Sequence, residues 1–230
     1  MRVEVNVFEL PPTPTVPVVG GGRYPVRRIY CVGRNYAAHA HEMGFEVDRE
    51  APFFFLKPAD AIVEDGAEIA YPRMTHNYHH EIELVVAIGK PGRDVPIDKA
   101  DDLIFGYAVG LDMTRRDLQL AARDKGRPWD TGKAFDESAP CGAITRKESA
   151  GDIRAANIRL EVNGEKRQAS PLSLLIWSIS EIIHWLSLFY DLEPGDLIYT
   201  GTPEGVGPVA AGDKLVGTVE GLEQLTVFIK

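Results

Sequence analysis

Residues 80–88 read HEIELVVAI, and this stretch indicates how the chain folds. Its apolar side chains recur at every second position, which is the pattern of a β-strand. One face carries four aliphatic side chains, those of Ile82, Leu84, Val86 and Ile88. The opposite face begins with two carboxylates and continues with small apolar residues, in the order Glu81, Glu83, Val85 and Ala87. We predict a sheet strand, at least partly covered on both faces, that presents two acids at one end.

Further strands are predicted on either side of this one. Phe105–Asp112 has the same alternation, and Asn163-Gly164, a pair that favours a type I′ turn, separates two halves of a hairpin. Those halves are Ile158–Val162 and Glu165–Ala169. The remaining predicted strands are Leu197–Thr200, Lys214–Val219 and Gln224–Ile229. The pattern predicts a β-rich α+β fold.

About three helices are predicted. The first lies within Asn35–Gly44, with the asparagine as its cap. Thr114, followed three residues later by an aspartate, resembles a capping box that opens a second helix ending near Lys125-Gly126. The third and longest helix starts at Ser170-Pro171 and is stopped by Glu193-Pro194-Gly195.

The length and the composition favour one globular domain. The chain has 230 residues, 44% hydrophobic and 26% charged, which is typical of a protein with a full core. Residues 11–25 (PPTPTVPVVGGGRYP) are predicted to be an irregular connector that follows an N-terminal strand at Val3–Phe8. We therefore divide the chain into residues 1–25, a strand and connector, and a main domain over residues 26–230.

Charge and cysteine usage exclude several classes of partner. The net charge is −9 and no run of Lys and Arg exceeds two residues, which argues against nucleic acid and anionic membranes as partners. The most apolar stretch, Leu172–Leu192, contains three ionisable residues and is not a membrane span. Cys31 and Cys141 lack metal-binding spacing, and the N-terminus does not resemble a secretory leader, so we expect reduced thiols in the cytoplasm.

Three carboxylates are candidates for a metal site. Glu81 and Glu83 lie on one face of a strand, where two like charges repel unless a cation compensates; the alternative is an exposed edge with two solvated acids. Asp112 ends a second apolar strand, although it could equally be a turn or capping residue. Three carboxylates without cysteine suit Mg²⁺ or Mn²⁺, or Ca²⁺, better than Zn²⁺.

The histidines near these acids do not form a zinc motif. His76, His79 and His80 precede the acidic pair, but Leu84 stands where the HExxH motif needs its second histidine. The segment also has the period of a strand, whereas that motif requires a helix. Zinc is therefore disfavoured.

A histidine and a glutamate on the first predicted helix are candidates for base catalysis. His39 and Glu42 are three residues apart and share one helix face, while His41 points elsewhere. A carboxylate beside an imidazole selects its tautomer and raises its basicity, as a water-activating base requires. The alternative is an ordinary surface pair.

Two lysines and one loop are weaker candidates. Lys57 and Lys133 follow apolar or small residues and could lie near the acids, although solvated lysines are commoner. The loop Gly201–Gly207 (GTPEGVG) lacks the features of a nucleotide-binding loop, but its bare amides could approach a small anion.

Six sequence blocks, in order along nearly the whole chain, resemble the fumarylacetoacetate hydrolase superfamily. The residues in these blocks are most similar to those of bacterial fumarylpyruvate hydrolases, enzymes of aromatic catabolism in the gentisate pathway. The blocks are Gly33–His39 (GRNYAAH), Phe55–Pro58 (FLKP), His80–Leu84 (HEIEL), Gly106–Gln119 (GYAVGLDMTRRDLQ), Lys133–Asp136 (KAFD) and Gly195–Pro208 (GDLIYTGTPEGVGP).

The resemblance implies a rolled mixed sheet around the active site, a homodimer, and a Mg²⁺ or Mn²⁺ ion. By this resemblance the metal ligands are Glu81, Glu83 and Asp112. The catalytic residues would be His39, Glu42 and Lys133. The substrate-binding residues would be Arg34, Lys57, Arg116, Gln119 and Thr202.

The reaction that the resemblance implies is the hydrolysis of a 2,4-dioxo acid, with fumarylpyruvate as the expected substrate and fumarate and pyruvate as products. The metal would act as a Lewis acid on the 2-oxo acid end, and His39, oriented by Glu42, would activate water. The helix that carries them is expected to belong to a lid over residues 35–50. Oxaloacetate decarboxylation, hydrolysis of shorter acylpyruvates, and non-catalytic binding of a small acid remain as alternatives.

Overall fold

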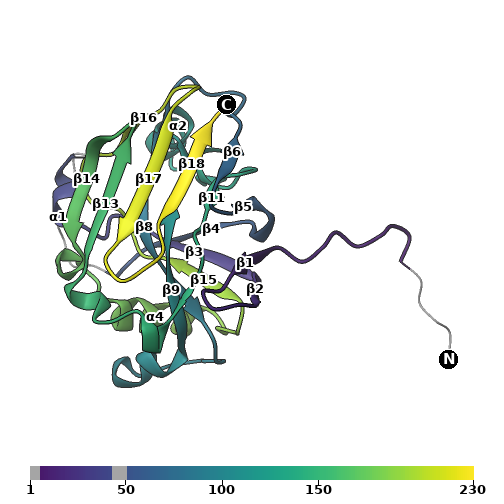
Figure 1. Cartoon of the computed structure of the whole chain (residues 1–230), viewed down its shortest axis with the longest axis vertical. Helices are drawn as coiled ribbons and strands as arrows, with labels where there is room; N and C mark the ends of the chain where they lie inside the picture. Colours follow the sequence, from purple (N-terminus) through teal and green to yellow (C-terminus); the bar gives the residue numbers. More distant parts are fainter. Residues whose placement is uncertain (1–5, 43–50) are drawn as a thin grey trace.

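Two large mixed sheets form the main body of the protein in the computed structural model, which describes residues 6–42 and 51–230, without the side chains of Ala40 and His41 (Figure 1). Neither sheet closes into a barrel within these residues. The β-rich character that the sequence predicts is confirmed.

The first sheet has six strands and contains the stretch from which the fold was predicted. Its order is β12 (Thr145–Arg146), β9 (Ile104–Leu111), β8 (Ile82–Ile88), β15 (Asp196–Tyr199), β3 (Arg28–Val32) and β4 (Phe54–Lys57). Neighbours are antiparallel except for β15 and β3, which are parallel. The predicted strands at 80–88 and 105–112 are therefore the adjacent pair β8 and β9.

The second sheet has five strands and comes mostly from the C-terminal third of the chain. Its order is β14 (Glu165–Pro171), β13 (Asn157–Val162), β17 (Lys214–Val219), β18 (Leu225–Ile229) and β6 (Ala67–Ile69). Asn163 and Gly164 have φ angles of 54° and 81°, as the predicted type I′ turn between β13 and β14 requires.

The six-stranded sheet is buried on both faces, which explains the continuous apolar run of β8. Leu84 and Val86 pack in one cluster with Leu160 and Leu215 of the five-stranded sheet. Val85 and Ala87 face a second cluster on the opposite side. That second face is the one that carries Glu81 and Glu83 at its end.

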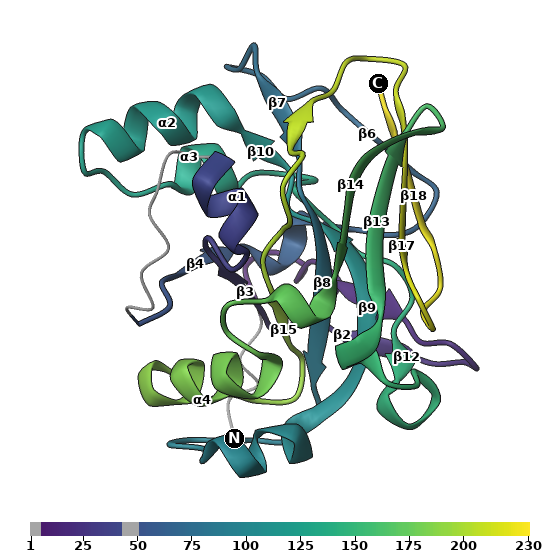
Figure 2. The ribbon, with the colours of Figure 1, turned by 90° about the vertical axis from the view of Figure 1, so that its left-hand side faces the viewer.

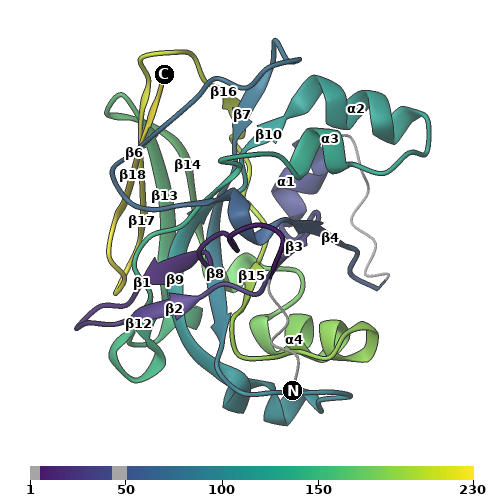
Figure 3. The ribbon, with the colours of Figure 1, turned by 90° about the vertical axis from the view of Figure 1, so that its right-hand side faces the viewer.

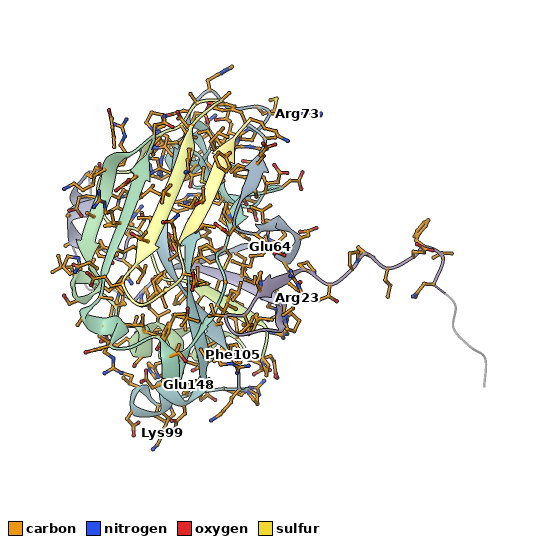
Figure 4. The ribbon with its side chains drawn as sticks, viewed as in Figure 1. Arg23, Glu64, Arg73, Lys99, Phe105 and Glu148 are labelled. Carbon is orange, nitrogen blue, oxygen red and sulfur yellow. The ribbon has the colours of Figure 1, made fainter. Side chains whose placement is uncertain are left out.

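Three small sheets complete the strand pairing. They are β1 (Thr15–Pro17) with β2 (Arg23–Pro25); β10 (Thr114–Arg115), β7 (Tyr78–His80) and β16 (Gly207–Pro208); and β11 (Ala139–Pro140) with β5 (Ile62–Val63). β1 and β2 lie side by side (Figure 3). Val16 and Tyr24 of this pair belong to the second cluster. Arg23 forms an ion pair with Glu64, which ties this pair to the main body (Figure 4).

Four α-helices are present in the described residues, on the side away from the five-stranded sheet (Figures 2 and 3). They are α1 (Ala37–Glu42), α2 (Arg116–Asp124), α3 (Asp130–Lys133) and α4 (Ile179–Phe189). Single 3₁₀ turns occur at η1 (Ala59–Ala61), η3 (Lys147–Ser149), η4 (Ile153–Ala155) and η5 (Leu172–Leu174), and η2 (Ile97–Leu103) is longer. None of these helices is long and apolar enough to cross a membrane.

The predicted start of the longest helix is wrong. Ser170 and Pro171 are extended and belong to β14, and α4 begins only at Ile179. Ser178 caps it, and the backbone N–H of Ser178 donates to the Glu181 carboxylate, 2.9 Å away. The sequence contains this capping box, whereas the predicted start rests on the Ser-Pro pair upstream. The helix also ends earlier than predicted, at Phe189.

Both other predicted caps are wrong, because their side chains are used elsewhere. Thr114 lies in β10, where its hydroxyl donates to the carbonyl of Asp112, and α2 begins at Arg116. The Asn35 amide binds the backbone of Trp177 and Thr200 and holds the start of α1 against the sheet. The single-turn helix α3 was not predicted.

The predicted connector 11–25 is not wholly irregular, because it contains β1 and β2. Of the predicted strand at Val3–Phe8, residues 6–8 form no strand and the others lie outside the described residues. Residues 43–50, which include the predicted helix end at Gly44 and most of the predicted lid, also lie outside them.

Candidate active site

Three buried carboxylates converge where β8 and β9 leave the sheet. Glu83 faces Gly110 across the antiparallel pair, and Asp112 donates its backbone N–H to the carbonyl of Glu81, 2.9 Å away. This register brings the start of one strand beside the end of the other. One ligand atom each of Glu81, Glu83 and Asp112 lies within 4.8 Å of the others, and all three residues are buried. The predicted cluster of acids is therefore formed.

Three cations surround these acids. Lys133 Nζ donates to Glu81 Oε2 at 2.8 Å and to Asp112 Oδ2 at 2.7 Å. Arg116 donates to the other oxygen of Glu81, and Lys57 Nζ lies 2.9 Å from Asp112 Oδ1. All three cations are buried, so the alternative of solvated lysines is excluded. Three negative and three positive side chains balance one another.

The pKa values of the acids differ because the cations are not evenly shared. Burial raises the pKa of Glu83 well above its usual range, and repulsion from Asp112 and Glu81 adds to this effect. Burial acts the same way on Glu81, but Lys133 and Arg116 outweigh it and lower the pKa. Burial alone would lower the pKa of Lys133, yet the carboxylates raise it. Lys133 is therefore a cation at neutral pH.

The donor set fits a hard divalent ion. Every ligand is a carboxylate oxygen, and each oxygen has a second lone pair beyond the hydrogen bond it accepts. Within the described part of the chain, Asp112 Oδ1 is buried without a well-oriented hydrogen bond, although Lys57 Nζ lies nearby. A cation would also relieve the repulsion felt by Glu83. Glu81, Glu83 and Asp112 could thus hold Mg²⁺ or Mn²⁺.

The predicted histidine–glutamate pair forms beside this cluster. On α1, His39 Nδ1 lies 3.3 Å from Glu42 Oε2. Glu42 also accepts the backbone N–H of Gly205, 3.2 Å from each carboxylate oxygen, so a distant loop holds the glutamate in place. His39 is buried and lines the same pocket as the carboxylates. With Nδ1 donating to Glu42, Nε2 keeps a lone pair for a proton.

The loop after β15 is anchored at both the carboxylates and the base. Gly201 donates its N–H to Glu83 Oε2 at 2.7 Å. Gly201 has a φ of 100°, and a Cβ atom there would lie 2.6 Å from Asn35, so only glycine fits this approach. Gly205 binds Glu42 as described above. The bare amides of this loop approach anions, as its glycines allow, but these anions are the Glu83 and Glu42 side chains of the protein itself.

Gln168 was missed by the sequence analysis, yet it connects this loop to the start of β8. Its side-chain oxygen faces the backbone N–H of Ile82 at 3.1 Å and Nδ1 of His80 at 3.0 Å. Its amide nitrogen donates to Thr202 Oγ1 and to the carbonyl of Pro203, both at 2.8 Å. Because Thr202 accepts from Gln168, its own hydroxyl hydrogen is left to donate into the pocket.

One pocket unites most of the predicted residues and encloses about 480 Å³, part of it open to solvent. The predicted residues that line it are Arg34, His39, Glu81, Glu83, Asp112, Arg116, Gln119, Lys133 and Thr202. Lys57 and Glu42 do not line it. Lys57 contacts Asp112, and Glu42 contacts His39, each from outside the pocket.

Three large side chains of the pocket were not predicted. Phe55 and Trp129 pack with ring centroids 5.9 Å apart and form an aromatic wall. Arg123 could have been predicted from the sequence, because it lies seven residues after Arg116 on the same helix face. The aromatic wall had no signal in the sequence, since it joins two segments that are distant along the chain.

The histidines before β8 take no part in a metal cluster. Among residues 6–42 and 51–230, only the three carboxylates form a group that could hold a metal. His79 hydrogen-bonds to Asn77, and burial together with Arg116 lowers the pKa of His79 to about 4. His80 is held by Gln168. The zinc interpretation stays disfavoured.

A buried all-oxygen centre that could hold a divalent metal lies beside a histidine–carboxylate pair, on the face of the six-stranded sheet turned away from the five-stranded sheet. This arrangement is typical of a metal-binding enzyme. The chain belongs to the fumarylacetoacetate hydrolase family, since the model described as "Fumarylacetoacetate (FAA) hydrolase C-terminal" matches residues 28–229. The resemblance noted in the sequence is thereby confirmed.

Similar proteins share most of this chain. It is 55% identical to fumarylpyruvate hydrolase from Ralstonia sp. over 81% of this chain and 98% of that protein. It is 46% identical to the human mitochondrial oxaloacetate tautomerase, over 89% and 92%. The crystal structure of fumarylpyruvate hydrolase from Pseudomonas aeruginosa, in complex with Mn²⁺ and pyruvate, is 53% identical and superposes with a TM-score of 0.95 over 98% of this chain and 99% of that one. The predicted family fold is confirmed.

Proposed function

We propose that this protein hydrolyses fumarylpyruvate to fumarate and pyruvate and requires Mg²⁺ or Mn²⁺. One observation carries the proposal: the carboxylate cluster, Lys133 and His39 meet in a single pocket, and Glu42 contacts His39 from outside it. The names of the Ralstonia and Pseudomonas relatives, and the Mn²⁺ and pyruvate bound in the latter, support it.

The 2-oxo acid end of the substrate would bind at the inner end of this pocket. Glu81, Glu83 and Asp112 would hold the metal, which supplies Lewis-acid polarisation of the adjacent oxygens. Arg116 and Gln119 stand beside it, with Arg116 Nη1 donating to Gln119 Oε1 at 2.5 Å. These two side chains and the Thr202 hydroxyl provide donors for the C1 carboxylate.

Lys133 would stabilise negative charge at the reacting carbons, and Lys57 would position it from outside the pocket. Lys133 is held as an ammonium group by Glu81 and Asp112, so it acts as a fixed positive charge and not as a base. Lys57 donates to the carbonyls of Met113 and Lys133 and thereby positions α3 under the pocket. Charge placed in this way before the reaction is worth several kcal/mol in typical sites, about 2.7–4 per donor.

His39 would remove the proton from the attacking water. Glu42 holds the imidazole with Nε2 free to accept, and the loop amide of Gly205 keeps Glu42 in place. The water oxygen bonds to C4, the C3–C4 bond breaks with its electron pair going to C3, and a proton returns to C3. The products are fumarate and pyruvate.

A panel of 2,4-dioxo acids tests the proposal. We expect pyruvate release from fumarylpyruvate with Mg²⁺ or Mn²⁺ added, and little release after treatment with EDTA. Acetylpyruvate, which has a shorter acyl end, measures the preference for the longer substrate. Full turnover by protein that contains no metal on elemental analysis would contradict the metal requirement.

Oxaloacetate is a second candidate substrate, because relatives named oxaloacetate tautomerase are 43–46% identical to this chain. The same 2-oxo acid end could bind at the carboxylate cluster, and either decarboxylation or proton transfer at C3 would follow. Measuring CO₂ release and enol–keto exchange from oxaloacetate beside pyruvate release from fumarylpyruvate distinguishes these reactions.

We also propose that the protein is a homodimer. β4 is an edge strand of the six-stranded sheet and exposes 43% of Leu56, and α4 exposes 45% of Leu188 and 61% of Phe189 nearby. Phe54 of β4 and Phe189 of α4 pack with ring centroids 6.3 Å apart, so these side chains form one apolar patch. Apolar edges of this kind are usually covered by a partner.

If the protein is a dimer through this patch, a charged residue introduced into the patch should dissociate it and halve the sedimenting mass. Phe189→Asp should shift the protein from twice 25.4 kDa to a single chain in sedimentation at micromolar concentration. Phe228→Asp, at a surface aromatic residue of the five-stranded sheet that is 37% exposed, is the control and should leave the dimer intact. A wild-type protein that sediments only as 25.4 kDa would refute the dimer.

A cytoplasmic location is proposed on the chemistry of the cysteines. Cys31 and Cys141 are both buried and unbridged. Burial raises the pKa of Cys141 to about 12, which keeps the thiol protonated and unreactive. Free thiols of this kind are typical of a reducing compartment.

A further inference from the structure

Helix α2 presents one face to the pocket along its whole length. Arg116, Gln119, Leu120 and Arg123 all line the pocket, and their spacing of three, four and seven residues places them on one side of the helix. The helix enters at the metal end, where the Arg116 side chain is only 4% exposed and contacts Glu81. It ends at the solvent side, where the Arg123 side chain is 32% exposed.

The two arginines of α2 therefore mark the two ends of the pocket. Seven residues of α-helix rise by about 10 Å. A 2-oxo acid whose head lies beside Arg116 would extend toward Arg123. Fumarylpyruvate carries a carboxylate at each end of a seven-carbon chain, and the long arginine side chains can reach both ends.

A second guanidinium lies at the outer end. Arg34 follows β3 with a φ of 57°, lies 5.4 Å over the Phe53 ring and lines the same pocket. Burial lowers the pKa of Arg34, and repulsion from Arg123 lowers it further, so the two positive groups feel each other. A carboxylate between two guanidinium groups would accept charge-assisted hydrogen bonds from both.

The charge and the walls of the pocket point to the same ligand. The three inner acids are balanced by three inner cations, and the outer end of the pocket is lined by the guanidinium groups of Arg34 and Arg123. Arg123 also pairs with Asp124 at 2.9 Å, but such an exposed pair is weak and a ligand can compete with it. Phe55 and Trp129 form the wall between the two ends, which suits a flat conjugated chain.

We propose that Arg123, together with Arg34, binds the distal carboxylate of the substrate and selects 2,4-dioxo diacids over acylpyruvates that end in an alkyl group. This inference rests on the proposed function, since it takes the 2-oxo acid head to lie at the metal carboxylates. The length of helix α2 then matches the length of the substrate, with the 2-oxo acid group at its first turn and the distal carboxylate at its last turn.

Calorimetric binding to the Mn²⁺-loaded protein tests this subsite without turnover. The probes are 2-oxoheptanedioate and 2-oxoheptanoate, which share the head and the chain length, lack the C4 carbonyl, and differ only in the distal carboxylate. The wild type should bind the diacid about 10- to 100-fold more tightly, as a charge-assisted hydrogen bond predicts. Arg123→Gln should reduce this ratio to about threefold or less and leave 2-oxoheptanoate binding unchanged, which also shows that the variant is folded.

Arg127→Gln is the matched control. Arg127 lies four residues further along, is exposed, and does not line the pocket, so its removal should leave the ratio unchanged. Equal binding of both probes by the wild type, or a ratio that survives Arg123→Gln, would overturn the subsite. An equal fall in both variants would assign the effect to the general charge of the helix end and would also overturn it. Failure of both probes to bind would overturn the proposed function itself.

Discussion

Replacing Glu83 by alanine is expected to abolish divalent-metal binding and to remove turnover. Glu83 would supply one of three oxygen ligands, and its loss would leave Glu81 and Asp112, which already pair with Lys133 and other cations. The fold should tolerate the change, because it relieves like-charge repulsion among buried carboxylates. The loss of one hydrogen bond from Gly201 opposes this gain.

Thermal unfolding with and without Mn²⁺ measures this prediction separately from activity. A ligand at 100 times its Kd stabilises a protein by about 2.7 kcal/mol. For a chain of this length that corresponds to a rise in Tm of roughly 5–10 °C. Wild type should show this rise and Glu83→Ala should not, while their metal-free Tm values stay within a few degrees.

Glu165→Ala is the control, since Glu165 is an exposed carboxylate on β14 that pairs with Arg167 at the surface. It should keep both the metal-induced rise and the activity. A Glu83→Ala protein that keeps the Mn²⁺ effect would show that the metal binds elsewhere.

Replacing His39 by alanine should lower kcat by about 10²- to 10⁴-fold, the usual worth of a positioned general base. The affinity for oxalate, which mimics the 2-oxo acid head, should change little, because oxalate would bind at Glu81, Glu83 and Asp112. Stopped-flow or coupled assays give kcat, and calorimetry on the Mn²⁺-loaded protein gives the oxalate Kd.

Two further variants define the role of the imidazole. Glu42→Gln keeps an acceptor for the Gly205 amide but loses the charge beside His39, so it should cause a smaller loss than His39→Ala. His76→Ala removes an exposed histidine outside the pocket and should have no effect. Near-normal turnover by His39→Ala would exclude this histidine as the base.

The strands of this fold were predictable because their side-chain pattern is local. The alternation of 80–88, the Asn163-Gly164 turn and the apolar run before Asp112 each depend on neighbours within a few residues. Helix starts were less predictable. Thr114 and Ser170 have the chemistry of caps, but pairing with β7 and β13 holds both in extended backbone.

The candidate site divides in the same way. The pairing of Glu81 with Glu83, and of His39 with Glu42, follows from strand and helix periods and was visible in the sequence alone. The burial of Lys57 and Lys133 was not, since each lysine is held by carboxylates from strands more than 20 residues away in the chain.

Only the tertiary structure could reveal the parts that join distant segments. Gln168, on β14, fills its hydrogen bonds with residues of β7, β8 and the loop after β15, and no local pattern marks such a residue. Arg34 and Arg123 lie on separate elements and share a pocket only once β3 and α2 are packed. Sequence periodicity determines which side chains share a face of one element, whereas long-range packing decides which faces meet.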